Sequence, residues 1–201
     1  MNFNLKKEEH YWTQRYNEQQ TGWDIGYPST PIKEYVDQLT DKSIHILIPG
    51  AGNAYEAEYM WKLGFQNVHI LDISDVPLKA FKKRNPNFPK HHMHQANFFE
   101  FKGQFDLIIE QTFFCSFLPS DENRNKYVRQ ISTLLKPKGK LVGVWFDIPL
   151  INDSNKRPFG GNKQLYIKYL SKFFKTVTFD RCYNSILPRQ GNELFGIFEK
   201  V

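Results

Sequence analysis

The sequence of 201 residues has little cysteine, no long apolar run and no concentrated block of charge. Its two cysteines, Cys115 and Cys182, are too few for a disulfide framework, so we expect free thiols and a cytoplasmic protein. No run of about 18 apolar residues is present, and the opening MNFNLKKEEHYW lacks the apolar stretch of a signal peptide, so we expect no membrane partner. The net charge of +6 comes from scattered residues rather than a basic arm, which argues against a nucleic-acid partner.

Apolar and aromatic residues, by contrast, are plentiful. Hydrophobic residues make up 40% of the chain and aromatic residues 16%, including 18 phenylalanines. This composition suits one domain over residues 1–201 with a sizeable core, and we expect a monomer. The polar and aromatic residues 1–40 precede the first predicted strand. We expect them to form a helical lid over a ligand site, or else a helix packed on one edge of a sheet.

Beyond residue 40, predicted strands alternate with predicted helices. Strands are expected at 44–48, 67–71, 92–95, 105–109, 139–146, 176–182 and 193–199, and helices at 54–63, 75–84, 121–135 and 164–173. This order predicts an α/β fold, a Rossmann-like, doubly wound sheet of seven strands that is mostly parallel and has helices on both faces. The last two strands have no helix between them, so we expect them to form an antiparallel hairpin at one edge.

The clearest motif is the stretch IHILIPGAGN, in which a strand ends in two glycines and a helix follows. Gly50 and Gly52 leave room for close approach to the backbone, and the helix after them points amide groups toward the same space. Asp72 ends the next strand, at the position where a carboxylate can accept the hydroxyl hydrogens of a ribose. The alternative is a tight turn whose glycines serve packing alone.

The same turn argues against a dinucleotide. A pyrophosphate-binding turn needs a third small residue where this chain has Tyr55. The motif is a better match for an adenosine ligand without phosphate, such as S-adenosylmethionine. Further along, Asn97 and Phe98 are candidates to contact the adenine. Glu110 and Gln111 end the fourth strand near the same crevice, where a carboxylate would suit a ligand ammonium group.

Six segments together resemble the thiopurine S-methyltransferase family, most closely its halide and thiol methyltransferase branch. They are YWTQRYNEQQTGWDIGYPSTP, ILIPGAGNAYEAEYM, VHILDIS, FDLIIEQTFFCSFLP, LLKPKGKLVGV and ILPRQGNELFGIFEKV. The resemblance implies a class I methyltransferase that uses S-adenosylmethionine to methylate a small thiol, a thiopurine-like heterocycle or a halide. The implied cofactor-binding residues are Trp12, Trp23, Gly50, Ala51, Gly52, Asp72, Ile73, Asn97, Phe98, Glu110 and Gln111.

The acceptor side is less defined than the cofactor side. The resemblance and the sequence together suggest Phe114, Cys115, Phe146 and Arg157 as acceptor-pocket residues, with Phe113 beside them. No Ser/His/Asp or Cys/His constellation is evident, so no catalytic residue is assigned. An acceptor that arrives as an anion needs no strong base, because the thiolate is the nucleophile. Arg157, Arg189 and Lys163 are candidates to supply positive potential.

Two questions remain at this point: whether the histidines bind a metal, and whether the protein is an enzyme. The histidines of KHHMH, His91 to His94, lack a cysteine or acidic partner at metal-ligand spacing, so we expect surface histidines and no metal. The main hypothesis is a methyltransferase with a small-molecule acceptor. The alternative is a non-catalytic protein that binds S-adenosylmethionine or S-adenosylhomocysteine.

Overall fold

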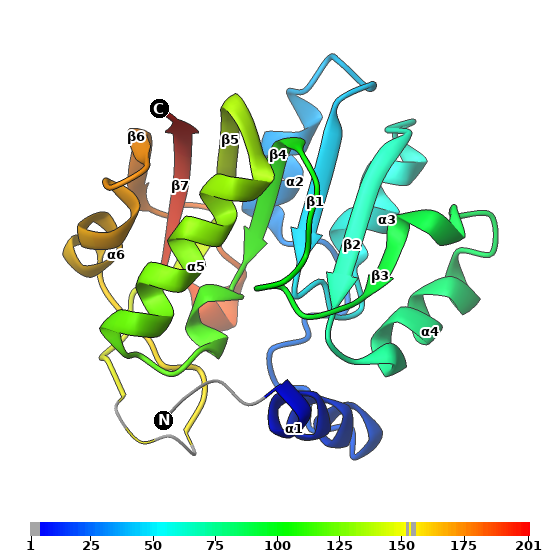
Figure 1. The fold of residues 1–201 in the computed structure, drawn as a ribbon, viewed down its shortest axis with the longest axis horizontal. Helices are drawn as coiled ribbons and strands as arrows, with labels where there is room; N and C mark the ends of the chain where they lie inside the picture. Colours follow the sequence, from blue (N-terminus) through cyan, green and yellow to red (C-terminus); the bar gives the residue numbers. More distant parts are fainter. Residues whose placement is uncertain (1–4, 152, 154–155) are drawn as a thin grey trace.

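The computed structural model describes residues 5–151, 153 and 156–201, and its seven strands form one sheet (Figure 1). The strands are β1 (His45–Pro49), β2 (Asn67–Asp72), β3 (Met93–Gln95), β4 (Phe105–Gln111), β5 (Leu135–Phe146), β6 (Phe174–Arg181) and β7 (Glu193–Lys200). Their order across the sheet is β3-β2-β1-β4-β5-β7-β6. The first five are parallel, and β7 is inserted antiparallel between β5 and β6. The predicted fold class, including the antiparallel C-terminal pair, is confirmed.

Helices cover both faces of this sheet because successive strand side chains point to opposite sides. Ile46 and Ile48 of β1 pack with α2 (Thr30–Asp37), α3 (Tyr55–Lys62) and α4 (Asp75–Arg84). Leu47, between them, packs on the other face, where α5 (Asp121–Leu134) and α6 (Lys163–Leu170) bury their apolar sides. The central strands are therefore continuously apolar, as a sheet buried on both faces requires.

Local sequence sets several helix boundaries. Ser74 and Ser120 cap α4 and α5, accepting hydrogen bonds from the backbone N–H of Val76 and Asn123. Such caps satisfy N–H groups that lack an intrahelical partner. Three short 3₁₀ helices, η1 (Lys90–His92), η2 (Phe114–Ser116) and η3 (Leu187–Arg189), lie in the connections.

The remaining helix, α1 (Leu5–Asn17), lies at the end of the molecule where β1 and β2 finish (Figure 1). None of its 13 residues, all of which the structure describes, is buried. In α2, by contrast, Ile32 and Val36 belong to the core. The lid expected from residues 1–40 stays a prediction, and its α2 part is packed into the core. Among the described residues, no helix has the length and apolar character needed to cross a membrane.

Candidate functional site

A cavity of about 530 Å³ lies between the carboxyl ends of the strands and α1. One side, here called the strand-end wall, includes Gly50, Asp72, Ile73, Asn97, Phe98 and Gln111. The opposite side, the lid wall, is one face of α1 with Glu8, Tyr11, Trp12, Arg15 and Tyr16. The rest of the lining includes Trp23, Thr112, Phe113, Cys115, Phe117, Phe146, Arg157, Pro188 and Arg189. The volume is typical of a site for one small molecule or cofactor.

Two positions in the turn after β1 require glycine, both because of their backbone conformation and because neighbouring side chains lie close to them. Gly50 and Gly52 have φ values of 60° and 53°, in the left-handed region that favours glycine. A Cβ on Gly50 would meet the ring of Phe113 at 2.1 Å, and one on Gly52 would meet the Tyr16 hydroxyl at 2.9 Å. The turn thus holds a protein side chain close on each side, which the motif alone does not reveal.

Asp72 lies at the tip of β2, buried but lining the cavity. Its Oδ2 accepts from the N–H of Gly52 and its Oδ1 from the N–H of Ser74, both at 2.9 Å. A carboxylate has about four acceptor positions, so capacity remains for a hydroxyl donor from the cavity. Burial raises the pKa of Asp72 to about 6, which leaves it mostly ionised at pH 7. This carboxylate is an acceptor well suited to the hydroxyl groups of a ribose.

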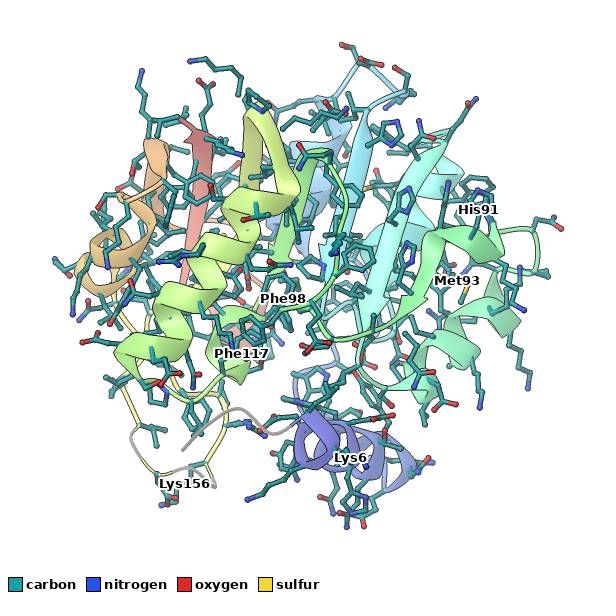
Figure 2. All side chains as sticks on the ribbon, viewed as in Figure 1. Lys6, His91, Met93, Phe98, Phe117 and Lys156 are labelled. Carbon is teal, nitrogen blue, oxygen red and sulfur yellow. The ribbon has the colours of Figure 1, made fainter. Side chains whose placement is uncertain are left out.

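Beside Asp72, the segment after β3 and the turn after β4 bring aromatic rings together. The ring centroid of Phe98 lies 5.2 Å from that of Phe113 and 6.2 Å from that of Phe117. Figure 2 shows Phe98 and Phe117 near each other. Asn97 uses its Oδ1 to accept from the N–H of Phe99, so its side-chain amide also shapes the turn. An apolar surface next to a ribose-binding acid is what a flat base requires.

Glu110 and Gln111 do not share the cavity, because adjacent strand residues face opposite sides of a sheet. Gln111 lines the cavity, and its Oε1 is buried without a protein partner. Glu110 is 0% exposed on the other side, where it accepts from the N–H groups of Phe113 and Phe114 and from the Tyr127 hydroxyl. Burial raises its pKa to about 7. The structure therefore gives Glu110 a role in positioning the turn after β4, not a place at the sulfonium end.

Other predicted residues also lie outside the large cavity. Ala51 and Gly52 border a small hollow beside the glycine turn. Phe114 points away, packing edge-on against Tyr127 and Tyr166. Cys115 does line the cavity, but its Sγ donates to the carbonyl of Thr112, and burial raises the pKa of the thiol.

The lid wall contains residues that the sequence analysis missed. Tyr16 is the main one: its hydroxyl lies over Gly52, and burial together with Asp72 raises its pKa. The predicted Trp12 and Trp23 contact each other edge-on at 5.3 Å, and Tyr16 contacts Trp23 at 5.7 Å. A signal was available, since residues 8, 12, 15 and 16 follow the spacing of one helix face.

Cationic side chains outnumber acids in this lining. Arg15, Arg157 and Arg189 line the cavity, against the carboxylates of Glu8 and Asp72. Among the described residues, no lysine or histidine does so. The predicted contribution of Lys163 is wrong, because its ammonium pairs with Asp180 at 2.6 Å on the exposed surface.

Arg189 links three parts of the site. It lies 5.3 Å above the ring of Phe146, pairs with Glu193 at 3.3 Å and donates to the carbonyl of Trp23 at 2.6 Å. The loop after α1 is thereby tied to η3. Phe146, which ends β5, lines the cavity, and its place beside the acceptor stays a prediction.

The histidines form a cluster away from the cavity. His92 is 7% exposed, so the expectation of surface histidines is wrong at this position. Its ring packs on His69 of β2 at 4.1 Å, and His69 Nδ1 lies 3.0 Å from His94 Nε2. Burial and the neighbouring histidines lower the pKa of His69 to about 4. Within the described part of the chain, no group of three metal-ligating side chains is positioned to hold an ion.

The arrangement suits the predicted S-adenosyl ligand. Asp72 can hold the ribose, the rings around Phe98 can flank the base, and the unpartnered Gln111 Oε1 is an acceptor near the glycine turn. No phosphate-binding cluster is needed, in keeping with Tyr55 at the start of α3. The cavity is lined on the remaining sides by rings and arginines.

Comparison with known proteins agrees with this geometry. The family model described as thiopurine S-methyltransferase matches residues 7–200. Two Arabidopsis thaliana proteins are similar over most of their length. Probable thiol methyltransferase 2 is 28% identical over 200 residues, covering 94% of this chain and 84% of that protein. Thiocyanate methyltransferase 1 is 27% identical over 205 residues, covering 96% and 86%.

Solved structures resemble the fold. A Burkholderia thailandensis 1,6-didemethyltoxoflavin-N1-methyltransferase, with its substrate and S-adenosylhomocysteine bound, has a TM-score of 0.76 at 14% identity, covering 100% of this chain and 92% of that one. The N-methyltransferase NodS from Bradyrhizobium japonicum, also with S-adenosylhomocysteine, has a TM-score of 0.63 at 14% identity, covering 94% and 97%.

Proposed function

Because the chain belongs to the thiopurine S-methyltransferase family and is an S-adenosylmethionine-dependent methyltransferase, we propose that its acceptor is a small anionic sulfur nucleophile, either a thiolate or thiocyanate. The observation that carries this choice is the cavity lining, in which three arginines lie among aromatic rings. The two carboxylates of the lining are already engaged, Asp72 with backbone N–H groups and Glu8 with Arg157. Arginine side chains in a partly enclosed site attract anions and raise their local concentration.

The cofactor-binding role of the strand-end wall is part of the same proposal. We assign Asp72 to the ribose, Asn97 and Phe98 to the base, and Gln111 to the amino-acid part. When bound, S-adenosylmethionine supplies a methyl group already activated by its positively charged sulfur.

The protein's own contribution to the reaction is alignment and exclusion of water. Trp12, Phe113, Phe117 and Phe146 form apolar walls around the space that the acceptor would occupy. The acceptor sulfur brings its own electron pair, so no side chain has to remove a proton from an acceptor that is already an anion. Cys115 is not assigned as a nucleophile, because its raised pKa keeps the thiol protonated.

Two wider properties belong to the proposal as well. We place the protein in the cytoplasm on the ground that Cys115 and Cys182 are both buried free thiols. We also propose that it acts as a monomer on small molecules rather than on nucleic acid.

The test is methyl transfer from S-adenosylmethionine to thiocyanate, hydrosulfide, iodide and 2-mercaptoethanol, measured as formation of S-adenosylhomocysteine. We expect turnover with at least one of the sulfur anions. Binding of S-adenosylhomocysteine without turnover on the whole panel would overturn the acceptor assignment and favour a non-catalytic binding protein.

A further inference from the structure

An ion pair joins the lid wall to the loop after β5. Arg157 Nη2 donates to both carboxylate oxygens of Glu8, each at 2.9 Å, although the two residues are 149 positions apart. Both side chains line the cavity. Figure 2 shows that their neighbours Lys6, on α1, and Lys156, on the loop, lie at the same end of the molecule.

This pair is a principal attachment of α1. None of its 13 residues is fully buried, and the rings of Trp12 and Tyr16, which pack on Trp23 of the loop that follows, are only partly covered. Its other polar links include a 2.9 Å hydrogen bond between Thr13 and the Ser74 hydroxyl and a long one, 3.4 Å, from Gln95 to Glu9. Releasing Glu8 from Arg157 would therefore loosen the lid wall.

Arg157 lies in surroundings that favour an anion beside it. Its guanidinium carbon is 4.4 Å from the ring centroid of Tyr11, 5.3 Å from that of Trp12 and 5.6 Å from that of Phe159. The side chains of Arg157 and Glu8 are only 10% and 18% exposed. A cation that has lost most of its water is stabilised by a paired negative charge, and Glu8 provides that charge within the chain.

The pairing with Glu8 nevertheless leaves part of the hydrogen-bonding capacity of the Arg157 guanidinium unused. The strongest arginine–carboxylate pairs use two nitrogens, each facing one oxygen. Here a single nitrogen, Nη2, makes both contacts, and Nε is buried without any acceptor. Another anion could accept hydrogen bonds from both Nε and Nη2 of Arg157, which Glu8 does not do.

We infer that Arg157 selects anionic acceptors and that Glu8 is a built-in competitor, which an entering anion displaces from the guanidinium. The inference rests on the proposed function, because it concerns the acceptor of that same site. It makes the lid responsive to the substrate: occupation of Arg157 by an acceptor frees Glu8 and with it one attachment of α1.

The test compares two substitutions that remove opposite charges from one pair. With thiocyanate as acceptor, we expect Glu8→Gln to lower KM about threefold or more, because the competing charge is gone while the amide oxygen can still accept from Arg157. We expect Arg157→Gln to raise KM about tenfold, because the guanidinium that holds the anion is lost. Arg157→Lys, which keeps the charge but not the fork, should fall between.

Matched controls lie one position away. Glu9→Gln and Lys156→Gln make the same charge changes at residues that do not line the cavity, and the amide oxygen of Glu9→Gln can still accept from Gln95. We expect their KM values to stay within about twofold of the original.

The outcomes separate this inference from the proposed function. If the ion pair serves only to hold α1 and the loop together, Glu8→Gln and Arg157→Gln will both raise KM and both weaken S-adenosylhomocysteine binding. In that case the inference is wrong. If calorimetry detects no binding of S-adenosylhomocysteine and no acceptor is methylated by the unaltered protein, the proposed function itself fails. Thermal melting of each variant shows whether a raised KM reflects unfolding.

Discussion

The strand-end wall and the lid wall face each other across one cavity, yet they are held by different kinds of contact. Asp72 is fixed by backbone N–H groups from its own turn and from the glycine turn, at the tip of a strand buried on both sides. The lid wall belongs to a helix without a buried residue, attached by Glu8–Arg157, Thr13–Ser74 and contacts between rings.

This difference indicates a division of labour. A wall made of backbone amides on central strands has few alternative arrangements, so it can hold the cofactor in one geometry. A helix attached by a few side chains can open at low cost and let ligands enter and leave. Damage to the strand-end wall should therefore affect stability and cofactor affinity, whereas damage to the lid wall should affect acceptor KM and exchange rates.

The largest effect is expected for Gly50→Ala. The left-handed φ of 60° costs a non-glycine residue about 1–2 kcal/mol, and the new Cβ meets Phe113, whose displacement adds about 1–3 kcal/mol. Urea unfolding should show a loss in the free energy of unfolding that includes both the backbone cost and the cost of displacing Phe113. Gly64→Ala is the matched control: φ is 88°, but nothing lies within 4 Å of its Cβ, so only the backbone term should appear. Equal losses in the two variants would contradict the close packing of Phe113 on the turn.

Asp72→Asn should weaken S-adenosylhomocysteine binding about 100-fold, because two hydrogen bonds to a charged acceptor are lost or reversed. Calorimetry measures the change. Asp180→Asn, the same substitution on an exposed edge-strand residue, should leave the affinity unaltered. An unchanged affinity in Asp72→Asn would remove the ribose assignment.

Cofactor affinity should also depend on pH through Asp72. Since burial raises its pKa to about 6, the dissociation constant should be flat above pH 7 and rise by up to about tenfold per unit below pH 6, as the acceptor becomes protonated. The effect on folding has the opposite sign: a raised carboxyl pKa means that the folded state binds the proton more tightly, so this group destabilises the fold above pH 6 and ceases to do so toward pH 3.8. Calorimetry from pH 5 to 8 tests the predicted rise in the dissociation constant. For Asp72→Asn, we expect the dissociation constant not to change over this pH range.

The smallest effect is expected on the lid wall. Thr13→Val removes the hydrogen bond to Ser74, and we expect the dissociation rate of S-adenosylhomocysteine to rise about threefold, with little change in melting temperature. Thr133→Val, which removes a hydrogen bond within α5, provides the comparison. A drop in melting temperature larger than that of Gly64→Ala would show that α1 is part of the core and not a loosely held lid.

Local sequence was sufficient for the strand-end wall. The run of apolar residues, the two glycines and the acid at the end of the next strand predict the turn and the position of Asp72, because each depends on neighbours in sequence or on the common edge where parallel strands end. The alternation of strands and helices likewise predicts the sheet. These features follow from periodicity and turn chemistry, which a sequence shows directly.

The residues that the sequence misplaced depend on contacts between distant segments. Whether Glu110 faces the cavity is decided by which side of β4 receives Tyr127 from α5, and whether His92 is exposed is decided by His69 from β2.

By itself, then, the sequence determined the sheet, the glycine turn and the acid beside it. Only the tertiary structure decided that Phe113 covers Gly50, that Tyr16 reaches Gly52 and that Glu8 meets Arg157 across 149 positions. The physical reason is that local preferences fix elements and their ends, whereas the partner of a side chain is chosen by how those elements pack.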